Sequence, residues 1–456
     1  MPAPGLAPRA SAWRILHLAR RGVPFDLALR RGLSGLAEPD RRLAHELAAG
    51  ALRQRAALDA AIAPHVAGGL DRVRDDLLDI LRVGAYQLLF LERVPRHAAV
   101  DTAVMLGRRL SGARVGGFVN AVLRKVAEQP RDSGCGQRDT GIEIRTGAPQ
   151  PTGVPASHVA GPSAETLALA FSHPDWLVAR WLERFGPEAT ERLLAANNSR
   201  PGLVLQPARW SAEALAAALD RQAIRWRPAP YGAGLIVEGR RPDQLPGFAA
   251  GAFFVQDPAQ ALAVRFFDAP EGARVLDACA APGGKALALA SRAGFVAAAD
   301  LRPTRARRMR ENLLRAGGVR AAVLVADALA PPVRPMDAVL FDAPCLGTGS
   351  FARHPDARWR VTPAALAALA AQAGRLLAAL ANVVRPGGLL FFATCSIEPE
   401  ENEVQIEAFL GGDRRFRREP SAAAPVELLS PAGDLILLPQ RHGTDGAYAA
   451  RLRRIS

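Results

Sequence analysis

Hydrophobic and polar positions alternate with a helical period through the first quarter of the chain. Apolar residues recur three or four positions apart in 13–19, 43–52 and 77–89, the spacing that gathers side chains on one face of a helix. Prolines separate these periodic runs. The pattern predicts an all-helical domain over residues 1–128.

The helical period then ends, and the pattern changes twice before the next large domain. Of the 35 residues from 129 to 163, 17 are Gly, Pro, Ser or Thr, a composition typical of flexible linkers. Two alternating stretches, 202–205 and 234–237, then flank a helical stretch at 211–219. We expect a flexible linker over 129–163 and a small α+β unit over 164–265 that packs on the following domain.

From residue 266 to residue 456, short apolar runs alternate with helical patterns. Such alternation is typical of an α/β fold in which helices cover both faces of a mostly parallel sheet. Two further stretches near the carboxyl end, 435–438 and 447–452, predict an antiparallel pair at the edge of that sheet. The runs that we interpret as parallel strands are 274–276, 295–299, 321–325, 338–341 and 389–393, with helices near 286–293, 304–316 and 363–384.

Three motifs directly follow predicted strands of this sheet. They are Asp277–Lys285, which contains a Pro-Gly-Gly turn, Asp342–Cys345, and Thr394–Ser396. Since the carboxyl ends of parallel strands share one crevice, we expect the three motifs to meet there although they lie far apart in sequence. The crevice would then hold two cysteines, two acids, a lysine and a glycine turn, which is a set of side chains suited to catalysis.

The charge of the chain indicates a polyanionic partner. The net charge is +14, and residues 1–128, with 20 basic and 12 acidic residues, carry +8 of it. Taken singly, arginine pairs are typical of a solvated helix face, but together they favour a surface that contacts nucleic-acid phosphates. A general bias toward arginine is the alternative, since only two of the 58 basic residues are lysines. The pairs are Arg20-Arg21, Arg30-Arg31, Arg41-Arg42 and Arg108-Arg109.

Cysteine usage and hydropathy argue against several classes of protein. Four cysteines in 456 residues, without a Cys-x-x-Cys pair or a Cys/His cluster at metal spacing, predict neither a disulfide framework nor a metal site. No segment reaches the roughly 20 uncharged apolar residues that span a bilayer, because Gln372 and Arg375 interrupt the nearest candidate, 364–384. Arginines recur through the first apolar stretch, unlike an export signal. We therefore expect a cytoplasmic protein that does not contact a membrane.

The turn after the first strand of the sheet favours S-adenosylmethionine over a nucleotide phosphate. Residues 277–285 contain neither Gly-x-Gly-x-x-Gly nor the P-loop signature, so both pyrophosphate fingerprints are missing. Asp300 ends the second strand, where a carboxylate can accept hydrogen bonds from both ribose hydroxyls of an adenosyl group. Asp327 ends the third strand, in a position to accept from the adenine amino group. Acids after three strands around a Gly-Gly turn predict a methyltransferase.

The residues after the fourth and fifth strands indicate which atom is methylated. Enzymes that methylate an exocyclic amine usually carry Asn/Asp-Pro-Pro-Tyr after the fourth strand, whereas this chain has Asp342-Ala-Pro-Cys345. Carbon 5 of a pyrimidine becomes nucleophilic only after a thiolate adds at carbon 6, which is covalent catalysis. We expect Cys395 to be that nucleophile and Cys345 to assist the elimination that follows.

Two more side chains support this interpretation. Asp342 would stabilise the charge that develops on the ring. Lys285, a lysine kept in a chain that otherwise uses arginine, would lie near the thiolate and favour its charged form. The alternative is that the cysteines are packing residues at the ends of buried strands, as single cysteines usually are. Two cysteines, each inside its own motif, favour catalysis.

These motifs resemble those of the RNA (cytosine-5)-methyltransferases of the Sun/Fmu type, in particular the bacterial RsmB-type enzymes that modify small-subunit ribosomal RNA. The resemblance implies that Cys395, in the Thr-Cys motif, is the nucleophile and that Cys345 aids release. The related DNA enzymes use the Pro-Cys thiol instead, so a cysteine at both positions implies RNA. The matching segments are Val255–Ala259, Leu276–Lys285, Asp342–Cys345, Gly347–Gly349, Arg353–Asp356, Thr394–Ser396, Pro399–Asn402 and Asp445–Gly446.

The resemblance also implies a fold and a cofactor site. The fold would be a class I Rossmann-like methyltransferase domain over 266–456, preceded by an all-α NusB-like RNA-binding domain that matches at His97–Val100 and Gly117–Arg124. Many relatives have serine at the position of Leu346, a departure that we expect to matter little. The residues implied to bind S-adenosyl-L-methionine are Cys279, Ala280, Ala281, Pro282, Gly283, Gly284, Lys285, Asp300, Asp327 and Asp342.

The motifs leave three functions open. The first is methylation of one cytosine in 16S ribosomal RNA, which the NusB-like segments favour by analogy. The second is the same chemistry on transfer RNA. The third is a non-catalytic RNA-binding or assembly factor, although an active site that no longer turns over would have lost some of its motifs. We expect a monomer that binds RNA and holds no metal ion.

Overall fold

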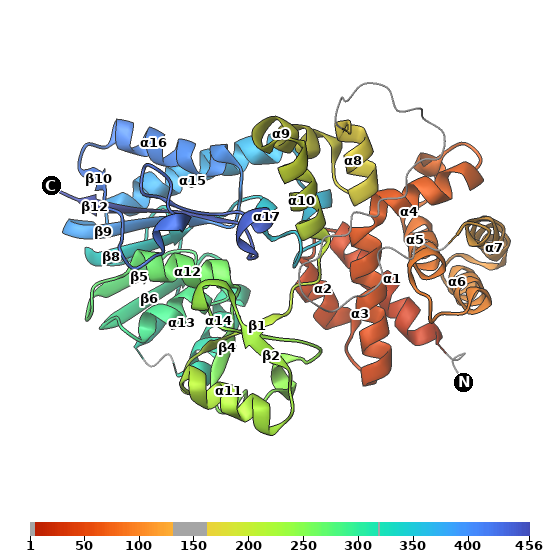
Figure 1. The fold of residues 1–456 in the computed structure, drawn as a ribbon, viewed down its shortest axis with the longest axis horizontal. Coiled ribbons are helices and arrows are strands. Elements are labelled where there is room, and N and C mark those ends of the chain that lie inside the picture. Colours follow the sequence, from red (N-terminus) through yellow and green to blue (C-terminus); the bar gives the residue numbers. More distant parts are fainter. Residues whose placement is uncertain (1–4, 131–161, 318–319) are drawn as a thin grey trace. The chain divides into compact units, whose positions relative to one another are not determined.

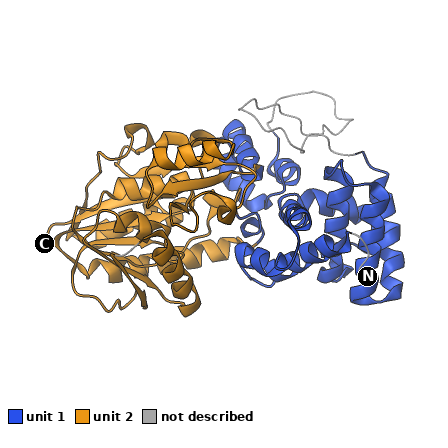
Figure 2. Ribbon diagram, turned by 90° about the horizontal axis from the view of Figure 1, so that it is seen from below, with its two compact units in different colours: residues 1–198, 354–359 blue, residues 199–353, 360–456 orange. Residues whose placement is uncertain are grey.

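The chain divides into two compact units (Figure 2). One comprises residues 1–198 together with 354–359, and the other comprises 199–353 and 360–456. Most of the linker predicted over 129–163, including Cys135, lies outside the described residues. The predicted domain boundaries stay predictions. The computed structural model describes residues 5–130, 162–317 and 320–456 (Figure 1).

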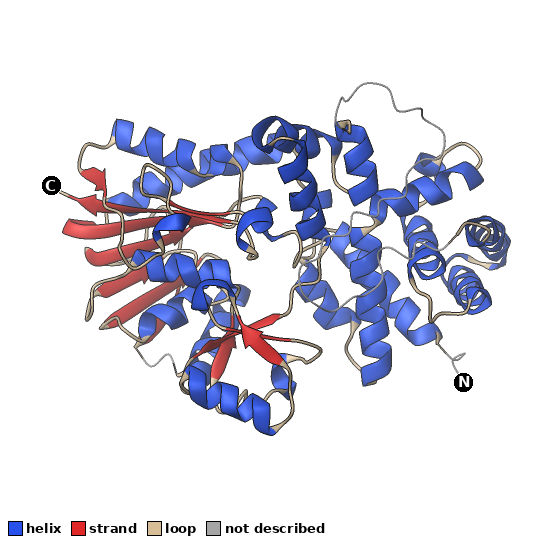
Figure 3. Cartoon of the chain, in the orientation of Figure 1, coloured by secondary structure: helices blue, strands red, loops and turns tan. Residues whose placement is uncertain are grey.

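The first unit is built from helices, as the apolar period predicts (Figure 3). Their apolar faces form one core, in which Ile15, Leu47 and Leu81 are fully buried. Burial of such a stripe, more than helix propensity, stabilises helices of this length. The N-terminal helices are α1 (Leu6–Arg20), α2 (Phe25–Gly32), α3 (Glu38–Arg53), α4 (Arg55–Ile62), α5 (Asp75–Phe90), α6 (Arg96–Ser111) and α7 (Ala113–Ala127).

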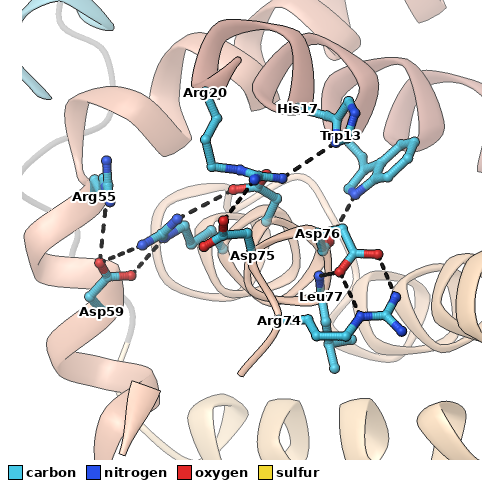
Figure 4. A network of polar contacts seen from close by, with 11 residues as sticks. Trp13, His17, Arg20, Arg55, Asp59, Arg74, Asp75, Asp76 and Leu77 are labelled. Carbon is cyan, nitrogen blue, oxygen red and sulfur yellow. Dashed lines mark hydrogen bonds and ion pairs between the residues drawn. The ribbon is translucent and has the colours of Figure 1, made fainter. Parts of the chain in front are cut away.

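A chain of ion pairs joins α1, α4 and α5 (Figure 4). Arg20 Nη1 lies 2.8 Å from Asp75 Oδ2, and Arg20 Nε lies 3.2 Å from Asp79 Oδ2. The guanidinium of Arg82 donates two hydrogen bonds to Asp59, at 2.7 and 2.8 Å. One of the arginines expected on a phosphate-contacting surface is thus held by acids of its own unit.

Three more helices and a short segment from later in the chain belong to this unit. Segment 354–359 contributes Arg358, which is fully buried and donates to the Ser172 carbonyl oxygen at 3.3 Å. Trp359 Nε1 donates to the Leu52 carbonyl oxygen at 2.7 Å. Residues that follow the second motif in sequence therefore pack among helices. The three helices are α8 (Ala164–Phe171), α9 (Asp175–Phe185) and α10 (Pro187–Asn198).

The second unit begins with a small antiparallel sheet and one helix, as the alternating stretches predict. The sheet packs on α14 (Pro303–Ala316), where Arg315 donates to the carbonyl oxygens of Phe248 and Phe253. The Arg315 guanidinium also lies over the Phe248 ring, 4.3 Å from its centre. In the described residues the strand order is β2-β3-β1-β4, formed by β1 (Leu203–Pro207), β2 (Trp226–Pro228), β3 (Leu235–Val237) and β4 (Phe253–Val255), with α11 (Ala212–Arg221).

The large sheet of this unit is parallel at its centre. Its strand order is β10-β12-β9-β8-β5-β6-β7, with β11 paired to β12. The strands from β9 to β7 in that order are parallel, and β12 is antiparallel to β9. All the predicted strands are present in the described chain: β5 (Arg274–Asp277), β6 (Phe295–Asp300), β7 (Ala321–Val325), β8 (Met336–Asp342), β9 (Val384–Thr394), β11 (Leu435–Leu437) and β12 (Ala447–Arg454), to which β10 (Phe416–Arg418) is added.

Helices cover both faces of this sheet, so its strands are apolar on both sides. Because the strands are pleated, successive residues enter different cores: Leu340 and Phe391 pack on one face, Phe341 and Phe392 on the other. The first face carries α12 (Pro258–Phe267), α13 (Gly284–Ala290) and α14, and the second carries α15 (Pro363–Ala381) and α16 (Glu403–Gly412); α17 (Pro439–His442) precedes β12.

Helix α15 is, within the described residues, the one helix long and apolar enough to cross a membrane by length and composition alone. Its residues Leu376, Leu377 and Leu380 are buried in the same core as Phe392 of the sheet. A helix that packs one face on a sheet behaves as a core helix of a folded domain.

Candidate active site

The three motifs predicted to converge do so at the carboxyl ends of adjacent strands. β8 lies between β9 and β5, and all three are parallel. Asp277 ends β5, Asp342 ends β8 and Thr394 ends β9. The segments that follow these residues therefore leave the same edge of the sheet, where open α/β sheets bind their ligands.

The two cysteines of these motifs lie in contact. Cys345 Sγ is 3.5 Å from Cys395 Sγ, and both residues are partly exposed. The hydrogen bond with Cys395 and burial raise the pKa of the Cys345 thiol well above its usual value, and the charges of Glu401 and Asp342 add to this. Cys345 is therefore protonated at neutral pH, so its S–H group can donate to the sulfur of Cys395.

Two glycines fix the loop after Cys345 against the turn at Cys395. Gly349 N donates to the Cys395 carbonyl oxygen at 3.0 Å, and Gly446 N donates to the Gly349 carbonyl oxygen at 2.7 Å. A Cβ atom at Gly349 would lie 2.6 Å from Gly446 Cα, a distance that no side chain tolerates. The close backbone contact thus requires glycine and holds the two sulfur-bearing loops together.

Glu401 is a candidate functional residue for which the sequence motifs predict no role. It is fully buried in the short 3-10 turn Pro399–Glu401, and its Oε1 accepts a hydrogen bond from Leu346 N at 2.8 Å. Burial raises the pKa of this carboxyl to about 7. Its position six residues after Cys395 is visible in the sequence, but only the fold shows that it contacts the loop of Cys345.

Arg353 is a second residue for which the sequence motifs predict no role. Its Nη2 lies 2.8 Å from Asp257 Oδ2, its Nε lies 3.2 Å from Asp445 Oδ2, and its Nη1 donates to the Gly202 carbonyl oxygen at 3.1 Å. Burial and the charge of Asp257 raise the pKa of Asp445 to about 7, and Arg353 opposes that shift. The loop that follows the Asp-Ala-Pro-Cys motif thus ends in a buried cluster of charges.

Lys285 contacts the acid of the second motif. Its Nζ lies 2.7 Å from Asp342 Oδ2 and also donates to Gln260 Oε1. The Lys285 side chain is only 8% exposed, so its charge requires such partners. Among the described residues the ammonium bonds neither sulfur, and a direct effect of Lys285 on the thiolate stays a prediction.

Asp277 and Asp300 are buried acids at neighbouring strand ends. Asp277 is fully buried, and neither of its carboxylate oxygens has a hydrogen-bond partner among the described residues. Burial, and then the charge of Asp342, raise the pKa of Asp277 to about 7. Asp300 is 5% exposed, and its Oδ1 accepts from Arg302 N at 2.9 Å. The unpartnered oxygens of Asp277 leave hydrogen-bonding capacity for a ligand, as a bound methyl donor requires.

The turn between β5 and α13 is rigidly held. Gly283 has a φ of +103°, a backbone conformation that side-chain-bearing residues rarely adopt. From α14, Arg305 Nη2 donates to the Ala281 carbonyl oxygen at 2.8 Å and Asn312 Nδ2 donates to the Pro282 carbonyl oxygen at 2.9 Å. A fixed turn without side chains at its tip is suited to close approach of a ligand, as the sequence predicts for residues 279–285.

The remaining residues implied to bind the cofactor have different surroundings. Burial and the charges of nearby acids raise the pKa of Cys279 to about 12, which makes this thiol a poor nucleophile. Asp327 is exposed, and its Oδ1 accepts from Leu329 N at 2.9 Å. It lies two residues beyond β7, whose last residue is Val325, rather than at the strand end. In the part of the chain that the structure describes, no group of three or more His, Cys, Asp and Glu could hold a metal ion.

Three protein families match successive parts of the chain. The family described as 16S rRNA methyltransferase RsmB/F matches residues 264–453. The NusB family matches residues 20–128, and the ferredoxin-like domain of RsmF/B-like methyltransferases matches residues 173–242. The crystal structure of PH0851 has the same fold, with a TM-score of 0.81, 24% sequence identity and coverage of 100% of both chains.

Two curated relatives match over nearly their whole length. The ribosomal RNA small subunit methyltransferase B of Pseudomonas putida is 35% identical over 98% of this chain and 99% of its own. The probable ribosomal RNA small subunit methyltransferase B of Synechocystis sp. is 31% identical over 98% of this chain and 100% of its own. With this identity over almost the whole length, the chain belongs to the RsmB/F family of 16S ribosomal RNA methyltransferases.

Proposed function

We propose that the protein methylates carbon 5 of one cytosine in 16S ribosomal RNA, with Cys395 as nucleophile, Cys345 as the residue that assists release, and S-adenosylmethionine as methyl donor. The observation that carries this proposal is the 3.5 Å distance between the two sulfurs. Covalent attack on a pyrimidine needs one nucleophilic sulfur. A protonated sulfur in contact with it is suited to assist its departure.

Cys395, Cys345 and Asp342 would each act on the cytosine ring. The Cys395 thiolate forms a bond to carbon 6, and the electron pair of the C5–C6 double bond moves to carbon 5, which takes the methyl group. A base then takes the proton from carbon 5, the double bond reforms, and the bond between sulfur and carbon 6 breaks with its electrons on Cys395. Cys345 donates its proton toward the departing sulfur. Asp342, held by Lys285, accepts a hydrogen bond from the cytosine amine while charge develops on the ring.

S-adenosylmethionine, when bound, supplies an electrophilic methyl group carried on a sulfonium. The turn over residues 279–285 would lie against it, with Asp300 accepting from the ribose hydroxyls and Asp327 from the adenine amine. Asp277 would accept from the ammonium group of the donor, since its buried oxygens have no other partner among the described residues. A bound cation would also lower the pKa of Asp277 from about 7.

The choice of 16S ribosomal RNA as substrate is supported by the family and by the NusB match over residues 20–128. The proposed domains are a NusB-like RNA-binding domain over 1–128, a linker over 129–163, an α+β unit over 164–265 and the methyltransferase domain over 266–456. A cytoplasmic location and a monomeric state belong to the same proposal. Transfer RNA is the alternative substrate, because the reacting groups would act on any extruded cytosine.

The proposal predicts that Cys345→Ala is trapped on its RNA. Without the proton of Cys345, release of Cys395 slows, so a covalent protein–RNA adduct should accumulate after incubation with 16S ribosomal RNA and S-adenosylmethionine. The adduct would appear as a slowly migrating band on a denaturing gel, and sequencing the trapped RNA would locate the cytosine. Cys395→Ala and the double variant should form no adduct. Cys135→Ala, which changes a cysteine outside the motifs, should turn over as the wild type does.

Three results would change the proposal. An adduct in Cys395→Ala would show that Cys395 is not the nucleophile. Adducts with transfer RNA but none with 16S ribosomal RNA or the small ribosomal subunit would move the substrate to transfer RNA. If the wild type transfers no labelled methyl group and no variant is trapped, a non-catalytic RNA-binding factor becomes the better function.

A further inference from the structure

The proposed reaction does not use Glu401, a buried carboxyl that contacts the Cys345 loop. It has no exposed surface and ends the short turn Pro399–Glu401. Its hydrogen bond from Leu346 N, at 2.8 Å, joins residues 55 positions apart in sequence. Leu346 directly follows Cys345, so this bond holds the backbone of the Cys345 loop to a turn that begins four residues after Cys395.

The proposed reaction requires Cys345 to keep its proton while Cys395 loses its own. Two thiols 3.5 Å apart cannot both ionise readily, because the second charge is repelled by the first. Either sulfur could therefore carry the charge unless the surroundings distinguish them. The hydrogen bond with Cys395 and burial are the main causes that raise the pKa of Cys345, and the negative charge of Glu401 acts in the same direction. Glu401 therefore adds to what disfavours a thiolate at Cys345.

We propose that Glu401 is a positioning residue that helps to assign the two sulfurs their roles: it anchors the Cys345 loop through Leu346 N and disfavours a negative charge on Cys345, so that Cys395 is the sulfur that attacks. This inference rests on the proposed function. A carboxyl at this buried position adds a negative charge, whereas an amide would make the same hydrogen bond without one. Cys345 then still holds the proton that it donates toward Cys395 when that sulfur departs.

Other charged groups near the two cysteines also affect the pKa values of Cys345 and Glu401. Asp342 also raises the pKa of Cys345, and Lys285 pairs with Asp342. Burial of Glu401 raises its pKa to about 7, and the charges of Glu398 and Glu400 act in the same direction. Glu401 is thus mostly ionised above pH 7, which is the range in which a thiol can lose its proton.

The test compares Glu401→Gln, Glu401→Ala and Glu400→Gln in the full-length protein. Glu401→Gln removes the charge and keeps an oxygen for Leu346 N, whereas Glu401→Ala removes both. Loss of the charge lowers the pKa of Cys345, so in Glu401→Gln this thiol ionises at a lower pH and can no longer donate. We expect the RNA adduct of Glu401→Gln to accumulate several-fold as pH rises from 7 to 9.5, while the wild type and Glu400→Gln release their RNA throughout.

A second measurement needs no RNA. In a Cys395→Ser background, the rate of alkylation of Cys345 by iodoacetamide, read by mass spectrometry of the Cys345 peptide, reports the fraction of thiolate at each pH. Adding Glu401→Gln should move the midpoint of this titration down by roughly one pH unit, and adding Glu400→Gln should leave it in place. Circular dichroism would confirm that each variant is folded.

The outcomes separate this inference from the proposed function. A midpoint that does not move with Glu401→Gln, or an adduct level independent of pH, would overturn the role of Glu401 and leave a hydrogen bond that only supports the fold. If the wild type transfers no methyl group, the proposed function fails, and the alkylation midpoint still decides whether Glu401 controls the proton on Cys345. Greater loss of activity in Glu401→Ala than in Glu401→Gln would support the anchoring of Leu346.

Discussion

At the scale of single residues, Asp277 shows how a prepared ligand site affects stability. A buried carboxylate without a hydrogen-bond partner destabilises the folded protein whenever it is ionised. Folding raises the pKa of Asp277 from 3.8 to about 7, chiefly by burial. The folded chain therefore keeps this proton at a pH where the unfolded chain has lost it. By linkage, the contribution of Asp277 to stability is most favourable below about pH 4, falls as pH rises, and levels off above about pH 7.

We predict that Asp277→Asn stabilises the ligand-free protein at pH 8 and changes its stability little near pH 4. Asparagine keeps the size of the side chain and removes its ionisation, so the gain at pH 8 should be on the order of 2–4 kcal/mol. S-adenosylmethionine should raise the melting temperature of the wild type more than that of the variant, because the carboxylate binds a cationic group. Differential scanning calorimetry from pH 4 to pH 8, with and without the donor, measures both effects.

Glu271→Gln is the matched control, since Glu271 is an exposed carboxyl just before β5. This change should leave the melting temperature unchanged at every pH. If the difference in stability between the wild type and Asp277→Asn does not grow with pH, burial does not raise the pKa of Asp277 as we infer. Equal stabilisation of the two proteins by S-adenosylmethionine would remove Asp277 from the cofactor site.

The residues that could be predicted from the sequence are those that sit in strand-end motifs. Cys345 and Cys395 each follow an apolar run, and the rule that parallel strands end at one edge was enough to bring them together. Glu401 and Arg353 could not be assigned roles in this way, because their partners lie 55 to 151 positions away and in different kinds of element. The end of β7 shows the same limit, since the strand ends at Val325 and Asp327 lies two residues beyond it.

At the scale of elements, the segment between β8 and α15 is held at its middle by Arg353. The Arg353 side chain is 24% exposed, and its partners Asp257 and Asp445 are 7% and 10% exposed. Asp257 also caps α12, where it accepts from Ala259 N at 2.7 Å. The arginine thus connects the loop that carries Cys345 with a helix start and with the turn before β12.

We predict that Arg353→Ala destabilises the protein by about 3–5 kcal/mol, because two buried carboxylates lose their counter-charge. Arg353→Lys should cost less, since it keeps the charge but cannot bond both carboxylates at once. Urea unfolding monitored by circular dichroism measures the change. Arg307→Ala is the control: its side chain is 85% exposed in an i,i+4 pair with Glu311, and it should cost about 0–1 kcal/mol. Equal effects of Arg353→Ala and Arg307→Ala would mean that the cluster does not hold the loop.

The elements were predicted well where apolar periodicity is strong. They were predicted less well where pairing with a neighbouring strand sets the bounds of a strand. The predicted parallel strands and the β11–β12 pair are present, because each is a continuous apolar run. β9 begins at Val384 rather than at Leu389, because Val384 pairs with Met336. The exposed residues 385–387 form a bulge between Val384 and Leu389. The short strands β2, β4 and β10 were not predicted. β2 and β10 contain arginines and so lack the wholly apolar run that marks the equally short β3 and β11.

At the scale of the whole molecule, residues 1–128 of the helical unit carry +8 of the net charge of +14, while the proposed reacting groups belong to the other unit. Some of its arginines serve the fold, as Arg20 does through Asp75 and Asp79. Arg30 and Arg31 near the end of α2 are exposed and form no ion pair within the described residues. Those two are therefore available to a polyanion, and their loss should weaken RNA binding without altering the chemistry.

We predict that the double variant Arg30→Ala, Arg31→Ala binds RNA more weakly and with a salt dependence, measured as the slope of log K against log salt, that is lower by roughly one to two. The KM for RNA should rise while kcat stays unchanged, because neither arginine contacts a reacting group. Arg74→Ala is the matched control, since Arg74 is 65% exposed but lies 2.6 Å from Asp76. Its charge is already neutralised by that acid, so its removal should leave the salt slope unchanged. If the double variant keeps the slope of the wild type, the arginine pair at the end of α2 is a solvated helix face, and the helical unit must bind RNA through other residues.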